Sequence, residues 1–204
     1  GQKAWNGVAI LSKKQLNITN TSIPKYDDPN ARFIETEIQL KEIKKNIKLI
    51  NIYLPNGNPI ETEKFDYKIE WMKKFNIYIQ DLKNKNIPII IAGDFNVIPS
   101  DDDVYSPENY KNDACAHPLT REQYRILINM GFTDLVKYFV PGKTNWTFWG
   151  YRGGGWQKGN GLRIDHFLST ANITDLIKKV EINREPRSWE KASDHTPVSI
   201  TLND

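Results

Sequence analysis

Two short clusters of polar residues have side chains suited to chemistry. Asp94 and Asn96 follow the apolar run 87–92, and Asp194 and His195 lie near the C-terminal end of the chain. Carboxylate and amide oxygens are ligands that Mg²⁺ prefers, and a carboxylate can take a proton from water. An imidazolium can donate a hydrogen bond to a phosphoryl oxygen. Together the clusters indicate hydrolysis of a phosphodiester.

The first cluster stands at the end of an expected buried strand. Residues two apart on a strand project to the same side, so we expect Asp94 and Asn96 to reach one phosphate or one water. The competing interpretation is an ordinary turn, because Gly93, Asp94 and Asn96 are residue types that turns favour. The motif alone does not separate the two.

Asp165 strengthens the interpretation of the second cluster. It lies in the otherwise apolar segment 162–168, where a carboxylate is costly unless it is paired. His195 is a natural partner, because a neighbouring carboxylate would orient its ring and raise its pKa. Arg163 or Arg152 are the alternative partners. By themselves, Asp194 and His195 are equally compatible with a solvated loop before an edge strand.

The remaining tyrosine and histidine candidates carry weaker signals. Tyr53 ends an expected strand, and its phenol can hydrogen-bond a phosphate, although a tyrosine there is also ordinary packing. His117 precedes Pro118 in a polar loop, so we expect it at the surface. His166 neighbours Asp165 along a strand, so we expect it to point away from the site.

The segment 146–163 mixes aromatic and cationic residues around several glycines. Its five aromatic residues accompany Arg152, Lys158 and Arg163. Aromatic faces stack on bases or sugars and cations meet phosphates, so the segment predicts contact with nucleic acid. A core strand followed by a flexible loop explains the same residues equally well.

Alternation of apolar and polar residues predicts the elements that position these groups. We expect strands over 8–11, 33–40, 47–53, 87–92, 146–149, 162–168 and 198–202. A short polar stretch separates the second strand from the third, which predicts a hairpin. We expect 151–161 to be a loop because of its glycines.

Two segments have the periodicity of amphipathic helices. Apolar residues from Phe65 to Leu82 share one helical face. A second helix is expected over 120–130, with Thr120 and Gln123 as a capping box and Gly131 as its stop. Strands that alternate with long helices indicate an α/β layered arrangement.

Composition narrows the classes of protein. The 204 residues suit one domain, and 39% hydrophobic with 11% aromatic residues argue against disorder. A net charge of +3 permits an anionic partner without requiring one. The single cysteine, Cys115, excludes an internal disulfide and fits a reducing compartment. Apolar runs are only strand-sized and no signal peptide is evident, so we expect a cytoplasmic protein without a membrane span.

Several motifs, taken in order, resemble one known family over the whole chain. The opening Gly1–Lys3 and Gly7–Ile10 are followed by Tyr53–Gly57, Gly93–Asn96, Leu162–Asp165 and Ser193–Val198. This order resembles the bacterial exonuclease III and AP endonuclease family of base-excision repair, within the endonuclease/exonuclease/phosphatase superfamily. The Leu-Arg-Ile-Asp and Tyr-Leu-Pro-Asn-Gly segments point to its DNA repair branch.

The resemblance implies a fold and a set of roles. The expected fold is a DNase I-like two-sheet sandwich flanked by helices (four-layer α/β/β/α), with residues 1–204 in a single domain. Asp94 would orient or deprotonate the attacking water, Asn96 would hold water and phosphate, and His195, braced by Asp165, would stabilise transition-state charge. The remaining implied residues are Tyr53 and Asn56 for the phosphate, Asp94, Asn96, Asp194 and His195 for the metal, and Phe148, Leu162 and Ile164 for the pocket of an abasic sugar.

The implied activity is that of a monomeric, Mg²⁺-dependent phosphodiesterase, with Mn²⁺ as an alternative. It would cleave duplex DNA 5′ to abasic sites and remove nucleotides or blocking groups from 3′ ends. Family members begin with a strand carrying an Asn and later a metal-binding Glu, and no Glu here stands in a matching motif. We therefore expect the chain to lack the family's N-terminal portion and its first strands. The alternatives are a phosphodiesterase acting on a lipid or inositol phosphate, and a catalytically impaired DNA-binding fragment.

Overall fold

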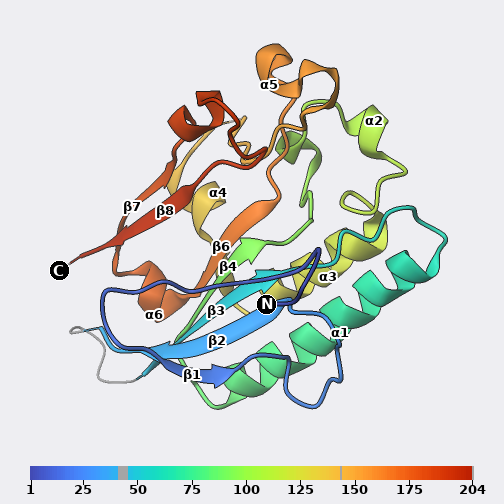
Figure 1. Ribbon diagram of the computed structural model, residues 1–204. Helices are drawn as coiled ribbons and strands as arrows, with labels where there is room; N and C mark the ends of the chain where they lie inside the picture. The colour runs from blue at the N-terminus through green and yellow to red at the C-terminus, as the bar shows by residue number, and fades with distance from the viewer. Residues whose placement is uncertain (41–45, 143, 204) are drawn as a thin grey trace.

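A six-stranded mixed sheet forms the centre of the computed structural model, which describes residues 1–40, 46–142 and 144–203 (Figure 1). The strand order is β1-β2-β3-β4-β6-β5, and only the β3–β4 pair is parallel. Its strands are β1 (Asn17–Asn20), β2 (Phe33–Ile38), β3 (Ile47–Tyr53), β4 (Ile89–Asp94), β5 (Phe132–Asp134) and β6 (Asp165–Thr170). A second, antiparallel sheet consists of β7 (Ile177–Ile182) and β8 (Val198–Leu202).

Two long helices and several short ones connect these strands. The α-helices are α1 (Glu63–Asn84), α2 (Pro107–Tyr110), α3 (Pro118–Asn129), α4 (Leu135–Phe139), α5 (Gly155–Lys158) and α6 (Ala171–Thr174). The 3₁₀ helices are η1 (Asp101–Asp103), η2 (Arg152–Gly154) and η3 (Glu185–Ser188). Within the described ranges, no helix combines the length and apolar character that a membrane crossing needs.

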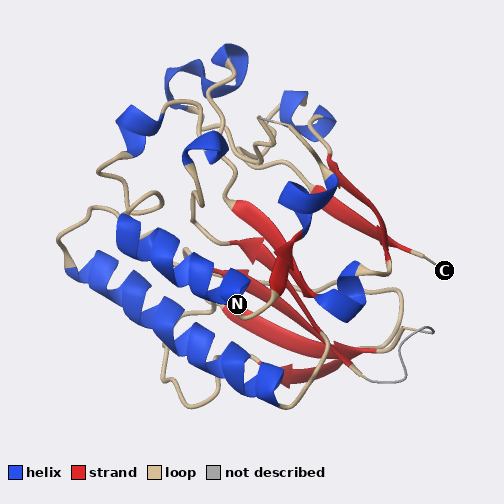
Figure 2. Ribbon diagram, turned by 180° about the vertical axis from the view of Figure 1, so that it is seen from behind, coloured by secondary structure: helices blue, strands red, loops and turns tan. Residues whose placement is uncertain are grey.

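The two faces of the main sheet have different covers. Helices α1 and α3 lie across one face, as the view from behind shows (Figure 2), and the second sheet lies on the other side. Strand β4 shows how the sequence specifies this: Ile89 and Ile91 join the core cluster with Trp71 of α1, while Ile90 joins the cluster with Val180 of β7. Alternate residues of a strand face opposite ways, so an entirely apolar strand is buried on both sides. The predicted two-sheet sandwich with flanking helices is confirmed.

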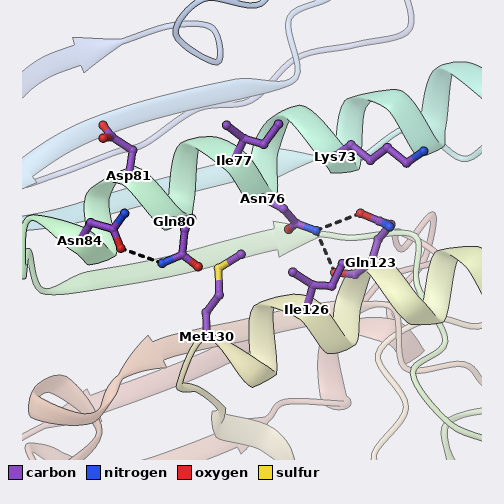
Figure 3. A pocket seen from close by; sticks show the side chains of 9 residues that line it. All are labelled: Lys73, Asn76, Ile77, Gln80, Asp81, Asn84, Gln123, Ile126 and Met130. Carbon is purple, nitrogen blue, oxygen red and sulfur yellow. Dashed lines mark hydrogen bonds between the residues drawn. The ribbon is translucent and has the colours of Figure 1, made fainter.

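A buried polar contact ties α1 to α3. The side-chain amide of Asn76 donates to the backbone carbonyl and to Oε1 of Gln123, each at 3.1 Å (Figure 3). The same helices border a groove of about 620 Å³ that includes the exposed Ile77.

The predicted capping box at Thr120 and Gln123 is wrong. Thr120 donates to the carbonyl of Ala114, and the ring of His117 caps α3 by accepting from Leu119 N.

Several strand predictions are confirmed in place. Segments 47–53 and 198–202 form β3 and β8, and β2 pairs with β3 as the predicted hairpin, whose connecting residues 41–45 lie outside the described ranges. β2 ends at Ile38 rather than at residue 40. The predicted helix 65–82 is the core of α1.

Other predictions are wrong, and the reason is pairing. Segment 8–11 is not a strand: the backbone carbonyl of Ala9 accepts a hydrogen bond from the side-chain amide of Asn51 on β3, at 2.9 Å. In segment 146–149 only Phe148 makes a bridge, to Leu162 and to His195. The predicted strand 162–168 begins only at Asp165, as β6, and Leu162 forms isolated bridges to Phe148 and Val104. The expected loop 151–161 contains η2 and α5, and β1, β5 and β7 are additional strands.

Candidate active site

Three neighbouring strands bring three polar side chains to one edge of the main sheet. Tyr53 is the register partner of Asp94 in the parallel pair β3–β4, and Asp94 is the partner of Asp165 in the antiparallel pair β4–β6. Side chains of register partners share a face of the sheet. Tyr53, Asp94 and Asp165, together with His195, line a cavity of about 410 Å³. The side chains predicted from separate motifs therefore converge.

The glycine before Asp94 allows the two central strands to approach. Gly93 has φ +132°, and a Cβ added there would lie 2.0 Å from the carbonyl oxygen of Ile52 on β3. No other residue fits this position without moving the strand that carries Tyr53. The motif Gly93–Asp94 thus sets the spacing of the site as well as supplying its carboxylate.

His195 pairs with Asp165, as the buried strand position of Asp165 predicted. Its Nδ1 lies 2.9 Å from Oδ2 and 3.1 Å from Oδ1 of that carboxylate. The ring also packs edge-on against Phe148, with ring centroids 4.9 Å apart. The alternative partner Arg163 is engaged elsewhere, because its guanidinium binds Asp103 and Asp134 at 2.8 Å each.

The charge of the His195 ring follows from this pairing. Burial alone would lower the pKa of His195, but the hydrogen bond and charge of Asp165, with Asp94 and Asp194 nearby, outweigh it and raise the pKa to about 9. The ring is therefore an imidazolium near neutral pH. With Nδ1 engaged, Nε2 is the donor available to an anion in the cavity.

Asp94 has the opposite environment. Burial, and then the negative charge of Asp165, raise the pKa of Asp94 to about 7, against the opposing effect of His195. A carboxylate that titrates near neutral pH is matched to the role of a general base. Thus Asp94 and His195 have pKa values displaced toward complementary base and acid roles.

Asn96 meets Asp94 by a different route from the one predicted. β4 ends at Asp94, and Asn96 has a left-handed backbone with φ +47° and is 5% exposed. Its backbone N–H donates to Oδ1 of Asp94 at 2.8 Å, and its amide donates to Oδ2 at 3.1 Å and to Leu54 O at 2.9 Å. The amide of Asn56 donates to Asn96 Oδ1 at 3.1 Å. Asn96 therefore binds both oxygens of the Asp94 carboxylate and sets its orientation.

Tyr53 lies half-buried on the other side of Asp94. Burial, together with the charge of Asp94, raises its pKa, so the phenol keeps its proton and can donate. The guanidinium of Arg32 lies over its ring at 5.0 Å and Nη1 donates to its backbone carbonyl at 3.1 Å. Sequence patterns did not single out Arg32.

Thr147 is a second residue that sequence reasoning missed. Its hydroxyl donates to Oδ2 of Asp165 at 2.6 Å and accepts from the backbone N–H groups of Asp165 and Ile164 at 3.1 and 3.3 Å. Asp165 is thus held by Thr147 and in turn holds His195. The only signal in the sequence was the position of Thr147 among aromatic residues, which does not specify a partner.

The residues expected to form an apolar pocket lie beside the site. Phe148 contacts His195, while Leu162 and Ile164 are 5% and 4% exposed and belong to an apolar cluster with Ile98. Leu162 and Ile164 therefore pack in the core of this edge, and only Phe148 of the three is partly exposed.

The predicted metal ligands do not form a complete set of donors by themselves. Asp94 lines the cavity, but Asn96 uses its amide on protein groups and the charged ring of His195 cannot coordinate a cation. Asp194 is not part of the cavity lining, although its charge contributes to the raised pKa of His195. In the described ranges, no group of three or more His, Cys, Asp or Glu side chains is placed to hold a metal ion.

Other predicted residues are confirmed or corrected by burial. His166 points away from the cavity as predicted: it is 1% exposed, between Arg163 Nη1 and Val97 O, and burial lowers its pKa to about 4. For Arg163, the core alternative that was open for segment 146–163 holds, because Arg163 is fully buried in its ion pairs. His117 is half-buried at the N-terminus of α3 rather than free at the surface.

Comparison with known proteins gives matches over nearly the whole chain. A model of the endonuclease/exonuclease/phosphatase family matches residues 1–195. A DNA-(apurinic or apyrimidinic site) endonuclease of Dictyostelium discoideum is 32% identical over 98% of this chain. An exodeoxyribonuclease III of Haemophilus influenzae is 32% identical over 97%.

The relatives are longer than the chain. It spans 54% of the Dictyostelium protein and 77% of the Haemophilus protein. Among solved structures, an AP endonuclease from Archaeoglobus fulgidus superimposes with a TM-score of 0.86 at 29% identity, covering 95% of this chain and 73% of that one. The chain is therefore similar to these proteins in both sequence and fold.

Proposed function

The chain belongs to the endonuclease/exonuclease/phosphatase family, and from this membership we propose that it is a DNA repair phosphodiesterase of the exonuclease III and AP endonuclease type. The observation that carries the proposal is the single cavity lined by Tyr53, Asp94, Asp165 and His195. Residues 1–204 would act as one domain and one subunit.

Asp94 is the proposed general base. It is the carboxylate of the cavity whose pKa lies near neutral pH, so it can accept a proton from water and then release it. The two hydrogen bonds from Asn96 fix both of its oxygens, which limits the directions from which a water can approach. The water oxygen would form the new bond to phosphorus as its proton passes to Asp94. The bond from phosphorus to the 3′ oxygen of the upstream nucleotide would break, and that oxygen would leave as the 3′-OH after taking a proton from solvent.

His195 and Tyr53 are the proposed donors to the phosphate. The imidazolium of His195 would stabilise the negative charge that grows on a phosphoryl oxygen in the transition state. The phenol of Tyr53, on the far side of Asp94, would hydrogen-bond a second phosphate oxygen. Asp165 and Thr147 act through His195 by fixing its ring.

The proposed substrate is duplex DNA, cut 5′ to an abasic site or trimmed at 3′ ends to leave a 3′-OH. The names of the relatives support this class of substrate. So does the segment around η2 and α5, where Tyr151 is 62% exposed and Arg152 and Lys158 are exposed. Exposed aromatic and cationic side chains suit contact with bases and phosphates.

We propose that the activity depends on a divalent metal, which the assay therefore includes. The exonuclease III and AP endonuclease family is in general metal-dependent, and we propose Mg²⁺, with Mn²⁺ as the alternative. Since the described residues do not complete a cation site, the roles given above are those of the side chains alone.

The test is cleavage of a duplex that carries one tetrahydrofuran site, with Mg²⁺ present. We expect the wild-type chain to cut the strand 5′ to that site and Asp94→Asn to lose about 10²- to 10⁴-fold of the rate. The matched control is Asp175→Asn, an exposed carboxylate beyond α6 that should leave the rate unchanged. Cleavage by Asp94→Asn at the wild-type rate would remove Asp94 from its role.

Binding without turnover is the second candidate. The incomplete set of metal ligands in the described ranges favours it. Retention of the uncut duplex, with affinity that falls steeply as salt rises, would support this candidate and count against the nuclease. Turnover of an inositol phosphate or lipid headgroup in place of DNA would overturn both.

A further inference from the structure

Lys68 is a fully buried lysine on the apolar face of α1. Burial of an ammonium group is costly unless its hydrogen-bonding capacity is used. All three of its N–H groups have a partner: Nζ donates to the backbone carbonyls of Asn96 at 2.7 Å, Pro55 at 3.0 Å and Asn56 at 3.2 Å. One charged group therefore holds two separate loops.

The two loops carry the paired amides next to the proposed base. Asn56 donates to Asn96 Oδ1 at 3.1 Å, and Asn96 donates twice to the carboxylate of Asp94. Lys68 donates to the backbone carbonyls of both amide residues, and these contacts add to the hydrogen bond between the two amides in fixing their relative position. Substrate contact by Lys68 is excluded by its complete burial.

The backbone on both sides of Lys68 has conformations that need support. Asn96 has φ +47°, and a non-glycine residue in the left-handed region costs free energy that the surroundings must offset. Gly57 has φ +86°, and a Cβ there would lie 2.5 Å from Cδ of Lys68. The chain thus packs directly on the aliphatic part of Lys68 while its ammonium holds the carbonyl of Asn96.

We propose that Lys68 is a positioning residue for the hydrolytic site: it holds the loops of Asn56 and Asn96 so that the Asn96 amide keeps the Asp94 carboxylate in its productive orientation. The inference rests on the proposed function. It assigns to a buried helix residue a part in the chemistry that takes place at the edge of the sheet.

The test compares Lys68→Met with Met72→Ala, a buried control one turn further along α1. Both substitutions destabilise the helix packing, but only the first removes the grip on Asn96. We expect Lys68→Met to lower kcat per folded molecule by about 10²-fold with little change in KM, because small displacements of a reacting group are costly. Met72→Ala should keep the wild-type kcat. Equal kcat values for the two variants would overturn the proposal.

Two further measurements keep the test decisive. If Lys68→Met does not fold, Lys68→Gln is the second variant. Its uncharged amide has two N–H donors in place of three, on a shorter side chain, and it should also lower kcat, so a wild-type kcat in that variant would overturn the proposal. Exchange of the side-chain amide protons of Asn96, followed by NMR, does not require turnover. The exchange rate should increase in whichever Lys68 variant folds and stay unchanged in Met72→Ala. An unchanged exchange rate in the Lys68 variant would overturn the inference. If the wild-type chain does not cleave DNA, that result overturns the proposed function, whereas the exchange measurement still tests whether Lys68 positions Asn96.

Discussion

Nδ1 of His195 lies 2.9 Å from Oδ2 of Asp165, and the hydroxyl of Thr147 donates to the same oxygen at 2.6 Å. The carboxylate is therefore held from two directions, by a hydroxyl that belongs to the neighbouring segment and by the ring that it orients. This fixes which ring nitrogen of His195 is engaged and which is available to substrate.

The pH dependence of activity should have two limbs. The pKa of Asp94 is raised to about 7 and its ionised form is the base, so kcat/KM should rise as pH increases through that value. The pKa of His195 is raised to about 9 and its protonated form is the donor, so kcat/KM should fall above that value. Initial rates on the tetrahydrofuran duplex across both values would check this. A rate that stays flat through the alkaline limb would contradict the role of the imidazolium.

Asp165→Asn should move both limbs of that profile toward lower pH. The variant loses the charge that raises the pKa of His195, and it also loses the repulsion that raises the pKa of Asp94. At a pH where the wild-type ring is charged, the rate should fall by about 10²- to 10³-fold, as expected when a transition-state donor is lost. An alkaline limb left in its original place would show that Asp165 does not control the ring, whereas Asp175→Asn serves as the control that should not shift it.

Thr147→Val should destabilise the fold more than its small change in shape suggests. Thr147 is fully buried, and the valine leaves Asp165 Oδ2 and two backbone N–H groups without this partner. We expect a loss of about 1–3 kcal/mol in the free energy of unfolding, measured by urea denaturation. Thr201→Val, on the exposed face of β8, is the matched change and should be nearly neutral.

Trp71→Ala and Trp5→Ala should differ strongly in stability. Trp71 is fully buried against Phe75, with ring centroids 5.3 Å apart, and its indole N–H donates to Asp28 at 2.9 Å. Its truncation should cost about 3–5 kcal/mol. Trp5 is 95% exposed, so its truncation should stay within about 0.5 kcal/mol. Thermal unfolding of both variants tests this, and similar losses would show that the packing around Trp71 is misassigned.

The strands that carry the site were predictable because their signal is local. Segment 47–53 alternates apolar and polar residues and is β3, and the apolar run before Asp94 becomes β4, buried on both faces. The order of the motifs along the chain predicted the family that the comparisons confirm. Periodicity needs only neighbouring residues, so the sequence alone carries it.

Contacts between distant residues were decided only by the tertiary structure. Asp165 had several candidate partners. Pairing of β4 with β6 placed it opposite Asp94, and the packed structure brought His195 to 2.9 Å from its carboxylate while Arg163 is buried in the core. Strands β1 and β5 have only four and three residues, and each pairs with a longer strand at an edge of the main sheet, β2 and β6 respectively. The sequence pattern did not single out Lys68, whose carbonyl partners Pro55 and Asn96 lie in two loops that are distant from it along the chain. A linear pattern specifies which face of an element is buried, whereas the partner of each polar group depends on distances that exist only once the elements have packed.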